Sequence, residues 1–245
     1  MAQDKKVALI TGANRGIGFE TAKQLGDNGI IVVVGARKLS DAEQTAASLK
    51  QAGVDARPVK LDVTSAEDRA AAAKYVTDTF GKLDILINNA GISGTEGLVT
   101  QTIETPEEQL VSVFQTNVFG VFSVTKEFLP LLKKSPAGRI VNLSSILGSL
   151  TLHADPNSPI AEFKNFAYDA SKSALNAFTI HLAHELKGTP IKVNSAHPGW
   201  VKTEMGTDAA PMEIPDGAKT SVELALLGAD GPNGRFIHMG EELPW

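Results

Sequence analysis

The residues that decide the fold are Thr11-Gly12-Ala13-Asn14-Arg15-Gly16-Ile17-Gly18, which follow the apolar run 7–10 and open a stretch of helical period. An apolar strand, a glycine-rich turn and a helix in this order form the first half of a βαβ unit whose turn can cradle a phosphate. Glycine is needed where a side chain would block the turn or the anion, and the helix N-terminus adds free N–H groups and partial positive charge. Since such a turn also occurs as an ordinary connection, the rest of the chain must support this interpretation.

Short apolar runs alternate with longer stretches of helical period along the whole chain. Continuous runs such as Val32-Val33-Val34 and Ile85-Leu86-Ile87 are typical of strands buried on both faces. The pattern predicts an α/β fold, a doubly wound parallel sheet of about seven strands with helices on both faces. We expect strands at 6–11, 30–36, 57–61, 83–88, 139–143, 191–196 and 235–238, and helices at 16–28, 41–52, 65–80, 107–133, 168–187 and 217–228.

Composition restricts the class of protein. A chain of 245 residues with 42% hydrophobic content supports one large core, and no linker or repeat divides it, so we expect one domain, 1–245. The net charge is -5 and Lys and Arg are scattered, which argues against a nucleic-acid partner. The apolar run 7–10 is too short for a signal sequence or a membrane span, so we expect a cytoplasmic protein with no membrane partner. The absence of cysteine excludes thiol nucleophiles and disulfides.

Further motifs follow the glycine turn in a fixed order across nearly the whole chain. They are D-V from 62, N-N-A-G from 88, N-V-F-G from 117, S-S from 144, Y-D-A-S-K from 168 and P-G-W-V-K-T from 198. In this order the chain resembles the compact branch of the short-chain dehydrogenase/reductase family. The resemblance implies a single Rossmann-type domain, with a nucleotide-binding part at about 1–120 and a catalytic and substrate-binding part at about 121–245.

The resemblance also implies a set of cofactor-binding residues. In it, Asp62 contacts the adenine amino group with Val63 beside it, residues 89–91 line the ribose and nicotinamide side, and Thr203 bonds the carboxamide. Taken alone, Asp62 is equally well explained as a helix-capping residue. Apart from Arg37, which is considered next, the set is Gly12, Asn14, Arg15, Gly16, Ile17, Gly18, Asp62, Val63, Asn89, Ala90, Gly91, Tyr168, Lys172, Pro198, Gly199, Val201 and Thr203.

The end of the second strand indicates which cofactor is used. NAD enzymes place an acid there to hold the ribose 2'-hydroxyl, but here the position is Ala36. Arg37 follows, and Arg15 lies in the glycine turn, so two guanidinium groups can converge on a 2'-phosphate. We therefore expect NADPH/NADP+ rather than NADH. The alternative is that both arginines are solvated surface charges.

The candidate catalytic residues lie on one helix and on the strand before it. Tyr168 and Lys172 are four residues apart, which puts a phenol and an ammonium on one helix face. The resemblance adds Ser145, with Ser144 as the alternative, to hold the substrate oxygen. It also adds Asn117 to hold a water that links Lys172 to solvent, although that residue is also explained as a core amide or a helix kink.

The implied reaction is the reversible NADPH-dependent reduction of a ketone or aldehyde to an alcohol, with Tyr168 as general acid/base. The alternative is an NADP(H)-binding sensor without turnover. The long stretch between Ser145 and Tyr168 resembles the carbonyl-reductase and menthone-reductase-like subgroup, and we expect 146–167, 94–100 and 203–216 to form the wall of a small-molecule carbonyl site. A homodimer, a homotetramer and a monomer all remain open.

The five histidines do not form a metal-binding set in the sequence. His181 and His184 are three residues apart on a predicted helix but have no third ligand at zinc spacing, so we expect them to face solvent and expect no metal. His197 precedes Pro198 and Gly199, and we expect its backbone rather than its imidazole to matter.

Overall fold

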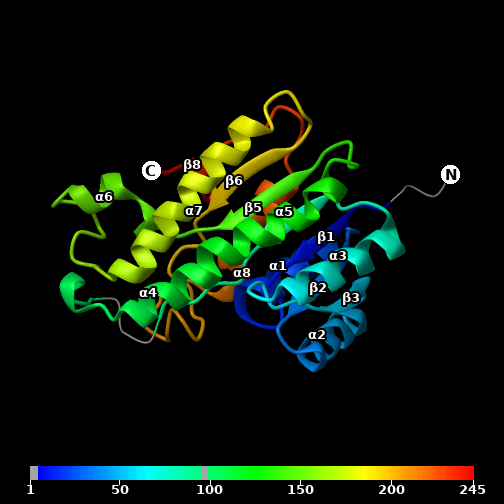
Figure 1. Cartoon of the computed structure of the whole chain (residues 1–245), viewed down its shortest axis with the longest axis horizontal. Helices are drawn as coiled ribbons and strands as arrows, with labels where there is room; N and C mark the ends of the chain where they lie inside the picture. The colour runs from blue at the N-terminus through cyan, green and yellow to red at the C-terminus, as the bar shows by residue number, and fades with distance from the viewer. Residues whose placement is uncertain (1–4, 95–98) are drawn as a thin grey trace.

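The computed structural model describes residues 5–94 and 99–245. These residues form an eight-stranded sheet in the order β3-β2-β1-β4-β5-β6-β7-β8, in which β8 runs antiparallel to β7 and the other neighbouring strands are parallel (Figure 1). The chain order reverses between β1 and β4, which are hydrogen-bonded neighbours with Leu9 opposite Leu86. In open α/β sheets the crevice at this reversal, at the carboxyl ends of the strands, is where ligands bind.

The strands lie close to their predicted positions. They are β1 (Val7–Ile10), β2 (Ile31–Ala36), β3 (Ala56–Lys60), β4 (Ile85–Asn88), β5 (Arg139–Leu143), β6 (Lys192–Ala196), β7 (Phe236–His238) and β8 (Glu241–Glu242). The helices are α1 (Gly16–Asp27), α2 (Leu39–Gln51), α3 (Ala66–Phe80), α4 (Glu107–Phe114), α5 (Val121–Leu132), α6 (Leu150–Ala154), α7 (Phe166–Glu185) and α8 (Ile214–Ala225), with short turns η1 (Thr102–Glu104) and η3 (Ile146–Gly148) and a π-helical segment η2 (Gln115–Gly120).

Alternate strand residues enter two separate cores, one on each face of the sheet. Ile85 and Ile87 pack with α1, α2 and α8, whereas Leu86 between them packs with α3, α5 and α7. Successive strand side chains point to opposite faces, so a strand covered on both sides must be apolar throughout. Figure 1 shows α3, α5 and α7 crossing the sheet on the viewer's side. The predicted doubly wound α/β architecture is confirmed.

Three predictions about elements need correction. The continuous helix predicted at 107–133 is wrong, because η2 interrupts it between α4 and α5. The segment 150–165, left without assignment, contains α6, whose first turn is capped by Ser149 Oγ accepting from Leu152 N at 3.1 Å. The strand β8 was not predicted, since its two residues form a strand only by pairing with β7.

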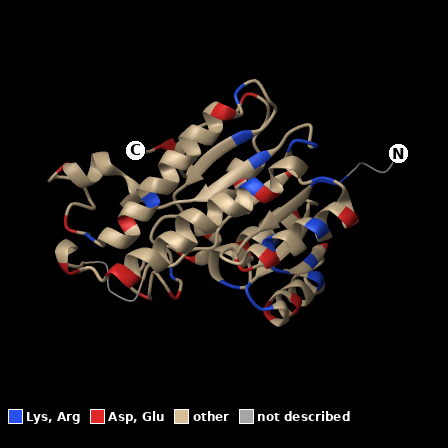
Figure 2. Ribbon diagram, viewed as in Figure 1, with Lys and Arg blue, Asp and Glu red and all other residues tan. Residues whose placement is uncertain are grey.

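The surface carries both signs of charge over the face drawn in Figure 2, with Lys and Arg interspersed among Asp and Glu. Within 5–94 and 99–245, no helix is long and apolar enough to cross a membrane.

Candidate active site

The glycine turn connects β1 to α1 at the reversal of strand order. Gly12 and Gly16 have φ values of +62° and +55°, in the left-handed region that favours glycine. A Cβ on Gly18 would lie 2.4 Å from Asn89 Nδ2 and 2.5 Å from Gly12 O, so only glycine fits where α1 approaches the end of β4. The N-cap residue of α1, Arg15, makes no side-chain cap, which leaves the first N–H groups of the helix to meet an anion.

Two asparagines at the end of β4 have different structural roles. Asn89 donates through Nδ2 to Thr11 O and Gly12 O at 2.8 and 3.0 Å, and its backbone N–H donates to Thr11 Oγ1 at 3.0 Å. Asn88 donates to Thr125 Oγ1 and Asn142 Oδ1 at 3.0 and 2.8 Å inside the sheet. Asn89 is therefore the residue that fixes the glycine turn, and Asn88 fastens β4 to its neighbours.

The adenosine side of the crevice is built at the ends of β2 and β3. Ala36 is buried, and Arg37 beyond it is exposed. Asp62 accepts from the backbone N–H and the hydroxyl of Thr64 at 2.9 and 2.7 Å. Burial acts to raise the pKa of Asp62, but the Thr64 hydrogen bonds and the positive charge of Arg37 lower it below its ordinary value. Since Ser65, not Asp62, caps α3, the capping explanation of Asp62 is wrong.

Asn14 and Arg15, two further residues of the glycine turn, have separate neighbours. Asn14 lines a cavity of about 250 Å³ together with Asp41 and Thr45. The Arg15 guanidinium forms an ion pair with the carboxylate of Glu204, and both side chains are exposed. The loop 203–216 thus reaches across the mouth of the crevice to the glycine turn.

The segment after β6 lies close to the same turn. A Cβ on Gly16 would be 3.5 Å from Thr203 Cγ2, and Gly199 has a φ of +88° with Met212 Sδ where its Cβ would be. Val201 is buried and forms an isolated bridge with Met212. Of the predicted residues in this segment, Thr203 lies beside the glycine turn, whereas Gly199 and Val201 pack against Met212.

His197 has a role that the sequence analysis missed. Its Nδ1 accepts hydrogen bonds from Ile146 N at 3.2 Å and from Gly199 N at 3.4 Å. Burial, followed by the nearby His238 ring, lowers the pKa of His197 to about 3, so the ring is neutral and can accept. The prediction that only the backbone of this residue matters is wrong, because the imidazole joins the residue after Ser145 to the wall segment. Its place directly after a strand at the carboxyl edge was the available signal.

The two serines after β5 have different partners. Ser144 donates to Asn176 Oδ1 at 2.7 Å and is buried in the body of the protein. Ser145 lies close enough to the phenol of Tyr168 to act on its pKa, and its Oγ accepts from Leu147 N at 3.2 Å. The geometry thus brings Ser145, and not Ser144, to Tyr168.

Tyr168 and Lys172 lie in the first part of α7; the lysine is buried and the tyrosine is partly buried. Burial raises the pKa of Tyr168 to about 12, while the Ser145 hydrogen bond acts in the opposite direction. Burial lowers the pKa of Lys172 to about 8. The Lys172 Nζ lies 5.5 Å from the centre of the Tyr168 ring. A positive charge this close stabilises the phenolate relative to the phenol.

Asn117 lies in η2 and is 1% exposed. Its Oδ1 accepts from Ile92 N at 2.9 Å, and its Nδ2 donates to Ile92 O at 2.8 Å and to Ser171 Oγ at 3.0 Å. The side chain is therefore a bridge between the strand-end segment 89–92 and α7, next to Gly91, where a Cβ would lie 3.5 Å from Lys172 Nζ. A π-helical turn is a frequent mark of functional sites.

The expected substrate wall is described in part. Of its three segments, 146–167 and 203–216 lie within the described chain, whereas residues 95–98 of the segment 94–100 lie outside it. Both His181 and His184 are exposed on α7, as predicted. The described residues hold no group of three or more His, Asp or Glu side chains that could bind a metal ion.

Comparison with known proteins agrees with this geometry. The family described as short chain dehydrogenase matches residues 6–214. The (-)-isopiperitenone reductase of Mentha piperita is 32% identical and covers 97% of this chain and 97% of its own length.

Two solved structures share the fold closely. Salutaridine reductase from Papaver somniferum superposes with a TM-score of 0.82 at 31% identity, over 95% of this chain and 99% of its own. The NADPH-bound carbonyl reductase from chicken fatty liver superposes with a TM-score of 0.86 at 26% identity, over 98% and 99% of the two chains. The predicted family is confirmed: the chain belongs to the short-chain dehydrogenase family of oxidoreductases.

Proposed function

We propose that this protein reduces a ketone or aldehyde to an alcohol with NADPH, in a reversible reaction in which Tyr168 is the general acid/base. One observation carries the proposal: the Ser145 side chain is close enough to the Tyr168 phenol to lower its pKa, and the Lys172 ammonium lies beside that phenol, at the same sheet edge as the glycine turn. We further propose that residues 1–245 act as one NADP-binding domain.

The residues present fit an NADP cofactor. The left-handed glycines at 12 and 16 expose backbone to a pyrophosphate, and the uncapped N-terminus of α1 meets its charge. Arg37 and Arg15 are the two cations available for a 2'-phosphate, and neither is buried. NADPH, when bound, supplies the hydride that the carbonyl carbon receives. The NADPH-bound state of the chicken carbonyl reductase supports this choice.

In this proposal, side chains of the protein bind the carbonyl oxygen of the substrate and supply the proton that it receives. Ser145 and Tyr168 donate hydrogen bonds to the carbonyl oxygen, and Tyr168 transfers its proton as charge develops there. Because burial keeps the pKa of Tyr168 near 12, the phenol stays protonated and ready to donate. The Lys172 ammonium then stabilises the phenolate. Asn117 fixes Ile92 and Ser171 beside Lys172, and its proposed water link to solvent is the route by which the proton is replaced.

The substrate wall consists of 146–167, 203–216 and the described part of 94–100. Its described residues include the exposed apolar side chains Leu150, Phe166 and Met205. We propose that the substrate is a small molecule with an apolar body, because such side chains favour an apolar ligand.

The test is NADPH oxidation measured with a panel of small aldehydes, cyclic ketones and bulky apolar ketones. Turnover of at least one class, abolished in Tyr168→Phe with NADPH affinity retained, supports a reductase. NADPH binding with no turnover across the panel supports the alternative of a sensor. The cytoplasmic location and the oligomeric state stay predictions.

A further inference from the structure

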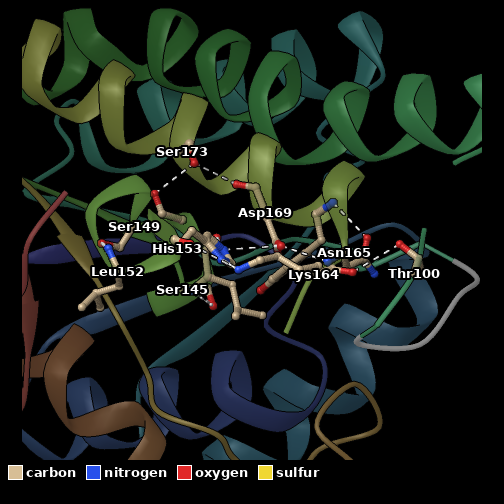
Figure 3. Close-up of polar contacts among 12 residues, drawn as sticks. Thr100, Ser145, Ser149, Leu152, His153, Lys164, Asn165, Asp169 and Ser173 are labelled. Atoms are coloured by element: carbon tan, nitrogen blue, oxygen red, sulfur yellow. Dashed lines mark hydrogen bonds and ion pairs between the residues drawn. The ribbon is translucent and has the colours of Figure 1, made fainter. Parts of the chain in front are cut away.

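A cluster of buried and partly buried polar side chains lies in the segment 146–167 and at the start of α7, beside the proposed catalytic residues. It consists of His153 on α6, Lys164 in the following loop, and Asn165 and Asp169 at the start of α7 (Figure 3). All of it comes from the long stretch between Ser145 and the first turn of α7. Of these residues only Asp169 falls within a motif quoted above, Y-D-A-S-K from 168, and no role is assigned to it there.

The protonation of His153 follows from its partners. Lys164 Nζ lies 3.0 Å from His153 Nδ1, and an ammonium can only donate, so Nδ1 is the acceptor. Burial lowers the pKa of His153, which keeps the ring neutral. The ring proton is therefore on Nε2. That nitrogen lies 2.9 Å from Leu147 O and 3.4 Å from Asp169 Oδ2.

Each of these two contacts connects His153 to a residue that carries a hydroxyl of the proposed mechanism: one to Ser145 and the other to Tyr168. Leu147 accepts from His153 through its carbonyl and donates through its N–H to Ser145 Oγ at 3.2 Å. A single residue thus joins the histidine to the serine.

The other route passes through the first turn of α7. Asp169 Oδ2 accepts from Asn165 N at 2.9 Å, and Asn165 Oδ1 accepts from Tyr168 N at 3.3 Å, so the two side chains close the helix start around the tyrosine. Asp169 is 7% exposed and Asn165 is 2% exposed. Water competes little for these bonds, and the turn is held firmly.

We propose that His153 is a positioning residue, which fixes the relative placement of the Ser145 and Tyr168 hydroxyls by joining Leu147 to Asp169. Lys164 selects the tautomer that makes both contacts. The inference rests on the proposed function, because it gives the two hydroxyls a shared substrate oxygen. Two donors that must converge on one atom lose effect when either moves by a fraction of an ångström.

The test compares His153→Leu, which removes the ring proton, with His153→Gln, whose amide can still donate to Leu147 O. His184→Leu, at an exposed position of α7, is the control. We expect kcat in His153→Leu to fall about tenfold with the NADPH dissociation constant unchanged, part of that loss to be recovered in His153→Gln, and the control to match the wild type. An unchanged kcat in a folded, NADPH-binding His153→Leu variant overturns the proposal, as does an equal loss in both His153 variants.

A double-mutant cycle tests the route through the carboxylate. If His153 acts through Asp169, the loss caused by His153→Leu must be smaller in the Asp169→Asn background than in the wild type. Fully additive losses overturn this route.

Amide hydrogen exchange separates this inference from the proposed reaction. We expect exchange to quicken at 146–154 and 165–169 in His153→Leu and to stay unchanged at 175–185. If the wild type turns over no carbonyl, the proposed function fails, while the exchange result still decides whether His153 holds the two turns together. Unchanged exchange at both turns overturns the inference itself.

Discussion

The Lys172 ammonium donates a hydrogen bond to Leu143 O at 2.8 Å, which fastens α7 to the last residue of β5. The strand that leads to Ser145 and the helix that carries Tyr168 are therefore joined by the same group whose charge stabilises the phenolate. Gly148 adds to this closeness, because a Cβ there would lie 2.8 Å from the Lys172 carbonyl carbon. The lysine is thus a structural and an electrostatic element at once.

Replacing Lys172 separates these two roles. In Lys172→Met the stem is kept and the ammonium is lost, so we expect kcat to fall by about 10²-fold or more and the free energy of unfolding to change by only about 1 kcal/mol. Turnover with saturating NADPH and urea unfolding measure the two quantities. A variant with full turnover would show that Lys172 serves only to hold α7.

Tyr168→Phe removes the proton donor and keeps the ring. We expect turnover to fall by about 10²-fold or more with NADPH affinity little changed, since the phenol acts on the substrate oxygen. The measurements are single-turnover reduction and fluorescence titration with NADPH. Tyr75→Phe is the matched control. Tyr75 lies on α3 and packs against the core formed with α3, α5 and α7, so this variant should retain full activity. Retained turnover in Tyr168→Phe would contradict the assignment of the acid.

Arg37→Ala tests the choice of cofactor. Only NADPH carries the 2'-phosphate, so we expect the variant to lose about 1.5–3 kcal/mol of NADPH binding and to bind NADH as before. Titration of the variant with each cofactor measures this. Arg57→Ala, on β3, serves as the control; its guanidinium pairs with Asp55, just before that strand. Equal weakening of both cofactors would mean that Arg37 supports the fold.

Glu204→Gln tests the ion pair across the mouth of the crevice. The Glu204 carboxylate occupies the guanidinium of Arg15, which is one of the two cations proposed for the 2'-phosphate. Releasing an exposed ion pair costs up to about 1 kcal/mol, so we expect NADPH to bind up to about fivefold more tightly. Glu213→Gln removes the partner of Lys202 in the same loop and should not affect NADPH binding. No difference between the two variants would show that Arg15 does not bind this phosphate.

Asp169 should make stability depend on pH. Burial raises the pKa of Asp169 from 3.8 to about 7, against the Asn165 N–H and the positive charge of Lys164, with neutral His153 also in contact. The folded chain then keeps a proton that the unfolded chain releases above pH 3.8. This stabilisation is complete below that value and is lost as pH rises through about 7.

The measurement for Asp169 is urea unfolding at pH 5 and at pH 8. We expect the free energy of unfolding to fall by about 1–2 kcal/mol more in the wild type than in Asp169→Asn, which has no proton to lose. A difference of the opposite sign would mean that the carboxylate form is the one stabilised by folding.

Local patterns were sufficient for the strands and for the glycine turn. Burial on both faces forces continuous apolar runs, and the tight turn at Gly12 and Gly16 requires glycine, so both leave a direct trace in the sequence. Local sequence patterns do not predict the structure where contacts between distant segments decide it. His153 and Asp169 meet only because α6 folds back on α7, and nothing in either segment alone indicates that contact.

The histidine after β6 illustrates the same limit. His197 accepts from Ile146 N because β5 and β6 are neighbours in the sheet, a pairing that follows from the topology and not from the residues around His197. The Ser149 cap of α6 has a local sequence signal, because a serine directly before Leu150 is a common N-cap residue. Pro156 and Pro159, which follow soon after, are more typical of a loop than of a helix, so the sequence pattern does not predict α6.

The π-helical segment Gln115–Gly120 has a consequence for how this chain tolerates change. A π turn is an α-helical turn with one residue inserted, and it survives although it is less stable than the regular form. Deletion of a single residue at Thr116 would let α4 and α5 run on as one regular helix, and the shortened helix should be at least as stable. The same deletion would swing Asn117 away from Ile92 and Ser171. Deleting this one residue would therefore keep or raise the stability of the helix and lower activity, so the π-helical segment favours activity over stability.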